Sequence, residues 1–186
     1  YNRTENYQSD CSYISQIKAF KDNVSIKSCL SYTFSVSNSQ GASLIKDRPF
    51  TAEMTRSIML LKEKPYRPRM ADYRIGVFFT GREQLGEGAK TTAPVYYANR
   101  WDIQPSDTAA YLRGEKVKPT KQIVFYIDNT FPEKWKPYLR EGVTQWNELF
   151  EQIGFKDVVA AKDFPTDDPE FDPDNIKYSC VRYAPS

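Results

Sequence analysis

The chain has 186 residues, of which 27% are charged and 40% are hydrophobic, and its formal net charge is +2. This length allows one medium domain or two small ones, because domains commonly contain about 100–150 residues. The near balance of charge argues against a nucleic-acid partner, and no stretch approaches the roughly 18 apolar residues of a membrane span.

Histidine is absent from the chain. Because histidine is the usual base of nucleophilic triads and the commonest zinc ligand, H-E-x-x-H and Ser-His chemistry are excluded within these residues. The cysteines Cys11, Cys29 and Cys180 lack the paired spacing of a zinc finger. Either Cys11 and Cys29 form a disulfide in an oxidising compartment, or they are buried free thiols, which we favour. We predict no catalytic, metal-binding or cofactor-binding residue in this chain.

The first two-thirds of the chain has the pattern of a β-rich region. Aromatic residues make up 15% of the sequence and favour half-buried strands. Apolar and polar residues alternate from Val24 to Val36, which predicts a strand with its apolar side buried. Residues 1–20 show no clear pattern. The remaining expectations are strands at 54–61, 73–80 and 95–103, a proline break at 64–69 and a loop at about 81–93.

From Gln122 onward the pattern changes to strand, helix, strand. The continuous apolar run Ile123–Ile127 predicts a strand buried on both faces, and further strands are expected at 158–161 and 176–183. A helix from about Pro137 to Ile153 is predicted to end at Gly154 and to pack its apolar stripe on the sheet. That stripe comprises Leu139, Val143, Trp146, Phe150 and Ile153. A right-handed crossover would make 123–127 and 158–161 parallel.

Several strings in the chain are specific in combination. They run Tyr66-Arg-Pro-Arg-Met-Ala-Asp-Tyr-Arg-Ile-Gly-Val-Phe78, Asn99-Arg100-Trp101, Ile123-Val-Phe-Tyr-Ile127, Pro132-Glu-Lys-Trp135, Gly142…Trp146-Asn147, Pro165-Thr-Asp-Asp-Pro169 and Val181-Arg-Tyr183. Together they resemble a family of bacterial secreted zinc-dependent metalloproteases of the metzincin type, which carry domains of unknown function ahead of the peptidase domain. The resemblance covers about two-thirds of the chain.

The resemblance implies an α+β protein in two parts. Residues 1–121 would be an accessory β-rich domain, the C-terminal part of a domain of unknown function, with mostly antiparallel strands. Residues 122–186 would be the N-terminal portion of a metzincin-like peptidase domain, with a mixed sheet and one long helix. In such enzymes a later H-E-x-x-H-x-x-G-x-x-H helix holds the zinc, and that helix is not among these residues. The chain would therefore be non-catalytic by itself, and zinc would belong to the full-length parent.

The sequence is also compatible with two other functions. The chain could be a stand-alone cell-surface module that binds a peptide or glycan, or a prosegment that covers a protease cleft. For the proposed parent we expect a secreted, periplasmic or cell-surface location, a peptide or protein substrate, and the rest of the peptidase domain as partner. We also expect self-association through the edge of a truncated sheet near 176–183.

Three further features have both a functional and a structural interpretation. The acidic loop from Asp163 to Asn175 could bind calcium, but Pro169 and Pro173 favour a solvated connector. The arginines Arg67, Arg69 and Arg74 could bind an anion, but pairing with carboxylates such as Asp72 is favoured. Trp135 and Trp146 could form an aromatic binding platform, but a place in the core is favoured. Glu141 and Glu148 lie off the apolar stripe and are expected in solvent.

Overall fold

A computed structural model describes residues 1–63, 66–86, 88 and 91–184, and strands outweigh helices in it. The strands are β1 (Asn2–Ala19), β2 (Asn23–Ser37), β3 (Ser43–Met59), β4 (Phe79–Leu85), β5 (Thr92–Ala98), β6 (Ile123–Ile127), β7 (Val159–Asp163) and β8 (Ser179–Val181). The helices are α1 (Thr108–Leu112), α2 (Lys136–Thr144) and α3 (Asn147–Gln152). The chain forms two compact units, one of Tyr1–Leu60, Val124–Arg140 and Ala161–Ser186, the other of Leu61–Ile123 and Glu141–Ala160.

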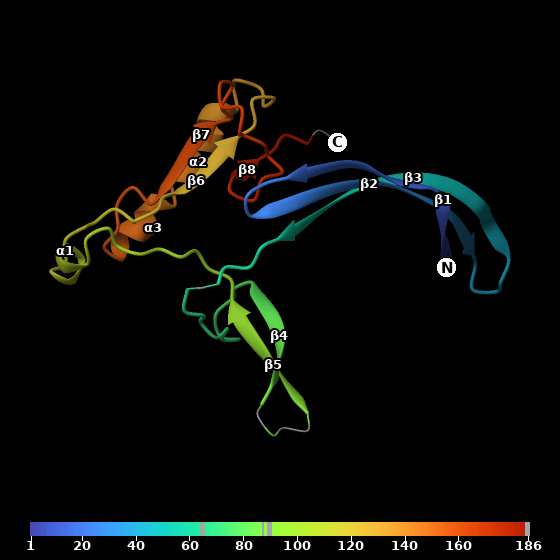
Figure 1. The fold of residues 1–186 in the computed structure, drawn as a ribbon, viewed down its shortest axis with the longest axis horizontal. Coiled ribbons are helices and arrows are strands. Elements are labelled where there is room, and N and C mark those ends of the chain that lie inside the picture. The colour runs from blue at the N-terminus through green and yellow to red at the C-terminus, as the bar shows by residue number, and fades with distance from the viewer. Residues whose placement is uncertain (64–65, 87, 89–90, 185–186) are drawn as a thin grey trace. The chain divides into compact units, whose positions relative to one another are not determined.

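The predicted N-terminal antiparallel sheet is confirmed. Strands β1, β2 and β3 lie side by side in that order, long and curved (Figure 1). The register places Lys18 opposite Ser25 and Ser25 opposite Ser57, so these three residues share one face. Because side chains alternate along a strand, the opposite face carries Tyr7, Tyr32 and Phe50. Strand β1 occupies residues for which the sequence pattern gave no expectation.

The alternation in β2 identifies the strand correctly but not its buried residues. Asn23, Ser25 and Ser28 are 3%, 4% and 6% exposed, whereas Val24 and Ile26 are only half-buried. In a central strand, small side chains are covered by longer side chains of the strands on both sides. The expected burial of the apolar face therefore holds at Leu30, which is 9% exposed, but is wrong at Val24 and Ile26, and polar residues are the more buried ones at this end.

Strands β4 and β5 form an antiparallel hairpin in the second unit. Residues 66–71 lie along β5, because the Ala71 amide donates to the Tyr96 carbonyl and the Ala98 amide donates to the Arg69 carbonyl. The expected strand at 73–80 is wrong over most of its length, since β4 begins at Phe79 and extends into the expected loop. Within that loop and the proline break, residues 64–65, 87 and 89–90 lie outside the described residues.

The strand-helix-strand order after residue 122 is confirmed. The sheet order is β7-β6-β8, and β6 and β8 are parallel. The Ile123 amide donates to the Val158 carbonyl and the Phe164 amide to the Ile127 carbonyl. Since both partners advance in the same direction, β6 and β7 are parallel as well. The predicted helical segment is present as α2 and α3, separated by Gln145 and Trp146.

The apolar stripe of this segment is not a continuous buried seam. Trp146 and Ile153 are 59% and 57% exposed, and Trp135 is 43% exposed, so the expectation that both tryptophans lie in the core is wrong. Gly154 ends the segment as predicted, with a positive φ of 88°. An added Cβ there would lie 2.9 Å from the Tyr111 ring, so the site requires glycine on both grounds.

The remaining structural expectations have mixed outcomes. Cys11 and Cys29 are not bridged, but Cys11 is exposed rather than buried. Arg74 pairs with Asp72 through two donors, at 2.9 Å and 2.5 Å, as expected. Glu141 and Glu148 are exposed, as expected. In the described part of the chain, no helix is both long and apolar enough to cross a bilayer.

Candidate functional site

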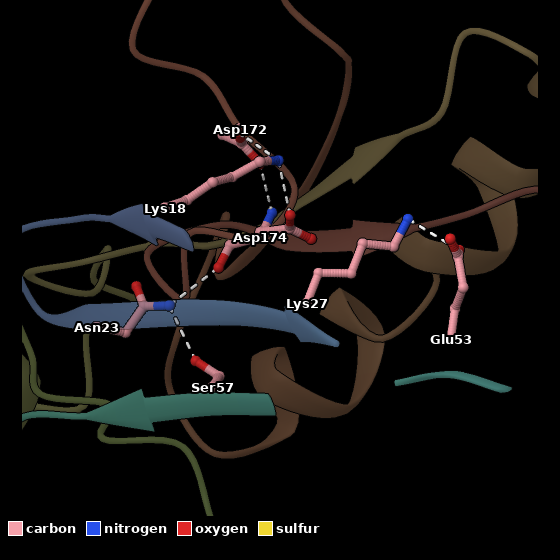
Figure 2. A network of polar contacts seen from close by, with 7 residues as sticks. All are labelled: Lys18, Asn23, Lys27, Glu53, Ser57, Asp172 and Asp174. Carbon is pink, nitrogen blue, oxygen red and sulfur yellow. Dashed lines mark hydrogen bonds and ion pairs between the residues drawn. The ribbon is translucent and has the colours of Figure 1, made fainter. Parts of the chain in front are cut away.

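The densest polar contacts between distant parts of the sequence lie at the end of the β1–β2 hairpin. There the polar face of the sheet meets residues 172–176, which precede β8 (Figure 2). Both segments belong to the same compact unit. We call the face formed by Gln16, Lys18, Asn23, Lys27, Thr55 and Ser57 the clasp surface, and residues Asp172–Ile176 the acidic segment.

Lys18 is the charged centre of the contact. Its Nζ lies 2.9 Å from Asp172 Oδ2 and 2.7 Å from Asp174 Oδ2, and all three side chains are only about one-third exposed or less, at 30%, 26% and 31%. Hydrogen bonds to Asp174 and Asp172 raise the pKa of Lys18 above its ordinary value. The ammonium group is therefore fully protonated at neutral pH and holds both carboxylates.

Asn23 recognises the backbone of the acidic segment. Its Nδ2 donates to the Asp174 carbonyl at 3.0 Å and to Ser57 Oγ at 2.9 Å. Its Oδ1 accepts from the Ile176 amide at 3.2 Å. A buried amide side chain needs such partners, because unsatisfied donors and acceptors are costly away from water. The burial of Asn23 is thus explained by the segment that it binds.

The acidic segment is shaped by its own carboxylates. Asp172 Oδ1 accepts from the Asp174 amide at 2.8 Å, a local turn that places both carboxylates toward Lys18. Burial raises the pKa of Asp172, but hydrogen bonds from the Asp174 amide and Lys18 outweigh it, so the pKa lies below the ordinary value. The predicted solvated connector is in this part bound to the sheet.

Two hollows flank the contact, and Asp172 lines both. One, of about 280 Å³, is also lined by Gln16, Lys18, Lys27, Thr55, Pro173, Asp174 and Arg182. The other, of about 660 Å³, lies between the hairpin turn and residues 169–178, and its wall includes Lys21, Phe171 and Tyr178. Lys27 is paired with Glu53 at 3.0 Å on the same face.

The pKa shifts at the site do not favour a role in proton transfer. A general acid or base works best with a pKa near the operating pH, whereas the shifts of Lys18 and Asp172 lead away from neutrality. Burial raises the pKa of the Cys180 thiol, which disfavours its nucleophilic thiolate form. Among the described residues, no three His, Cys, Asp or Glu side chains are grouped as metal ligands. The calcium interpretation of the acidic loop gains no support.

Asp128 is a second carboxylate that the sequence analysis did not single out. It follows β6, is 8% exposed, and accepts from the Thr130 amide at 2.9 Å and the Thr130 hydroxyl at 2.8 Å. The hydrogen bond from the Thr130 backbone lowers its pKa. An aspartate directly after a buried strand and before Asn-Thr is a local signal for such a turn. The acidic segment lies in a loop that the sequence did point to, as a calcium site or a connector, but Lys18 and Asn23 had no comparable signal.

The fold and the contact define a β-rich domain whose sheet binds a distant acidic segment of its own chain. The chain belongs to the family described as a domain of unknown function (DUF5117), whose family model matches residues 1–106. Comparison with curated proteins and with solved structures gives no match.

Proposed function

We propose that this chain supplies an accessory β-rich domain and the first scaffold elements of the peptidase domain of a zinc-dependent metallopeptidase, and that it is non-catalytic by itself. The sequence strings that resemble metzincin-type proteases support the proposal. The lack of histidine supports the second half of it, because metzincin zinc sites are built from three histidines. Zinc, a peptide or protein substrate and a secreted or periplasmic location would all belong to the longer parent.

The observation that carries the proposal is the exposure of large apolar side chains on α3 and its flanks. Trp146, Leu149 and Ile153 are 59%, 53% and 57% exposed, and Trp146 belongs to one of the strings that carry the resemblance. Trp146 and Leu149 also line a hollow of about 350 Å³. Large apolar side chains that cluster at the surface commonly mark an interface. Further residues of a peptidase domain would cover them.

The arrangement of β6, α2, α3 and β7 also supports the proposal. A strand, a helical crossover and a parallel strand form the unit with which a mixed α/β sheet can begin. In the proposed parent, the metzincin-like domain would extend this sheet and place its zinc-binding helix beyond these elements. The domain boundary at 121/122 stays a prediction.

The proposal can be tested by sequencing the encoding gene and by assaying the full-length protein that it encodes. The reading frame should continue into an H-E-x-x-H sequence, and the full product should contain about one zinc per chain and digest casein. A chelator should abolish digestion, whereas the 186-residue chain should show neither zinc nor digestion. A full product without histidine ligands, zinc or chelator-sensitive digestion would contradict the proposal.

One observation favours the second candidate function, a stand-alone cell-surface module that binds a peptide or glycan. The face of the sheet opposite the clasp surface carries a row of rings from all three strands. The Tyr7 and Tyr32 centroids are 5.4 Å apart, and Tyr32 stacks on Phe50 at 5.3 Å. Such rings can stack on sugars or apolar side chains. Saturable binding on a glycan or peptide array, lost in Tyr7→Ala, together with a reading frame without H-E-x-x-H, would favour this candidate.

A further inference from the structure

The clasp surface has the features of a peptide-binding surface that is already occupied. We propose that it is a docking site for short acidic segments, and that Asp172–Ile176 is its occupant in cis. The inference concerns a different face from the aromatic row and does not depend on a protease parent. The structure supplies three independent reasons for it.

The first reason is charge complementarity. Lys18 contacts two carboxylates of the occupant, and Lys27 and Arg182 line the same hollow. A hydrogen bond between charged groups is stronger than one between neutral groups, and partial burial reduces its screening by solvent. The surface therefore selects a segment with carboxylates two residues apart, as in Asp172-Pro173-Asp174.

The second reason is that the backbone of the occupant is recognised as well. Asn23 donates to the carbonyl of Asp174 and accepts from the amide of Ile176, and it is 3% exposed. These two contacts use main-chain groups that every peptide carries. They fix the direction and register of the bound segment, while the carboxylate contacts supply the preference for acidic sequences.

The third reason is that the occupant has no strand or helix of its own at the contact. Residues 172–176 lie between β7 and β8 in turns and bends, and they meet the surface through side-chain contacts. Such a segment can leave its surface without disrupting a ladder. Because it is tethered, its effective concentration is on the order of millimolar, so a free peptide displaces it from the natural chain only in large excess and binds more tightly when the cis contact is weakened.

The test uses the full 186-residue chain and a labelled synthetic peptide with the sequence of residues 168–178. A chain carrying Asp172→Asn and Asp174→Asn has a weakened occupant and an intact surface. It should bind the peptide about tenfold more tightly than the natural chain, which corresponds to about 1.4 kcal/mol. Adding Lys18→Met to the double variant should remove that gain. Adding Lys116→Met instead is the matched control, because Lys116 also forms an ion pair, with Glu151 at 2.7 Å, but is not part of the clasp surface, and it should leave the affinity unchanged.

Two hydrogen-exchange measurements separate a loss of binding from a loss of folding. Protection of the β1–β3 amides from hydrogen exchange shows whether each variant retains the sheet. In the natural chain, excess peptide should displace the occupant and speed exchange of the Ile176 amide. Equal binding by a peptide with asparagine in place of Asp172 and Asp174, binding insensitive to Lys18→Met, or no binding to a folded double variant would each overturn the proposal.

Discussion

The ammonium group of Lys18 lies 2.7 Å from the carboxylate of Asp174, 156 positions further along the chain. Lys18→Met keeps the aliphatic stem and removes the charge, leaving two carboxylates without their cation. We expect the free energy of unfolding to fall by about 1–2 kcal/mol in a urea titration. Lys27→Met, which removes the more exposed pair with Glu53, should cost less than about 1 kcal/mol. Equal losses in the two variants would contradict the special role of Lys18.

The contact should weaken in acid and in strong base. The pKa of Asp172 is lowered in the fold, so its stabilisation is complete above the unfolded pKa of about 3.9 and is lost as the pH falls through the lower folded value. The pKa of Lys18 is raised, so its stabilisation is complete below about 10.4 and is lost as the pH rises through the higher folded value. The stability difference between the natural chain and Lys18→Met should therefore be constant between about pH 5 and 9 and shrink below about pH 4. A difference that does not change down to about pH 2 would be inconsistent with this assignment.

Replacing glycine by alanine should have opposite effects on stability at two positions, Gly154 and Gly142. Gly154→Ala forces a left-handed conformation on alanine and places a Cβ 2.9 Å from the Tyr111 ring, so it should cost about 2 kcal/mol or more. Gly142→Ala lies in α2 with open space around the new Cβ, so it should stabilise the chain by about 0.5–1 kcal/mol. Thermal unfolding of both variants shows whether each substitution raises or lowers the stability. Destabilisation by both would contradict the open space around a Cβ at Gly142.

Trp146→Ala distinguishes the isolated chain from the proposed parent. Because the side chain is 59% exposed, the substitution should change the stability of the 186-residue chain by about 0.5 kcal/mol or less. In the longer protein, where a peptidase domain would cover it, the loss should approach the roughly 3–5 kcal/mol of a buried aromatic truncation. Chemical unfolding of the natural and Trp146→Ala forms of both proteins measures the two losses in stability. The same small effect in both would remove the main support for a covering domain.

Sequence patterns predicted those secondary-structure elements that are determined by neighbouring residues along the chain. The apolar run at Ile123–Ile127 predicted a strand, and it is β6, although only its end residues are buried and the three between them are half-buried. Gly154 ends the helical segment, since a positive φ at a helix end favours glycine. In contrast, β1 is polar and exposed along much of its length, and its pairing with β2 carries no period-two signal of its own.

The candidate site could not be predicted for the same physical reason. Lys18 and Asp174 are adjacent only because a long-range fold brings them together, and neither spacing nor composition encodes that contact. The stripe through Trp146 followed helical periodicity correctly, but periodicity identifies a shared face and not what covers it. In β2, the pattern likewise gave the strand but not the burial of Asn23, which depends on a segment 151 positions away.

The most direct test of the contact is hydrogen exchange at the Ile176 amide, which donates to Asn23 Oδ1. In the natural chain this amide should exchange more slowly than an unprotected amide, and Asn23→Ala should remove that protection while the β2–β3 amides stay protected. The same substitution should lower the free energy of unfolding by about 1–3 kcal/mol, because the Asp174 carbonyl and the Ile176 amide lose their partner. An Ile176 amide that exchanges in the natural chain as fast as in an unfolded peptide would contradict the account of this site.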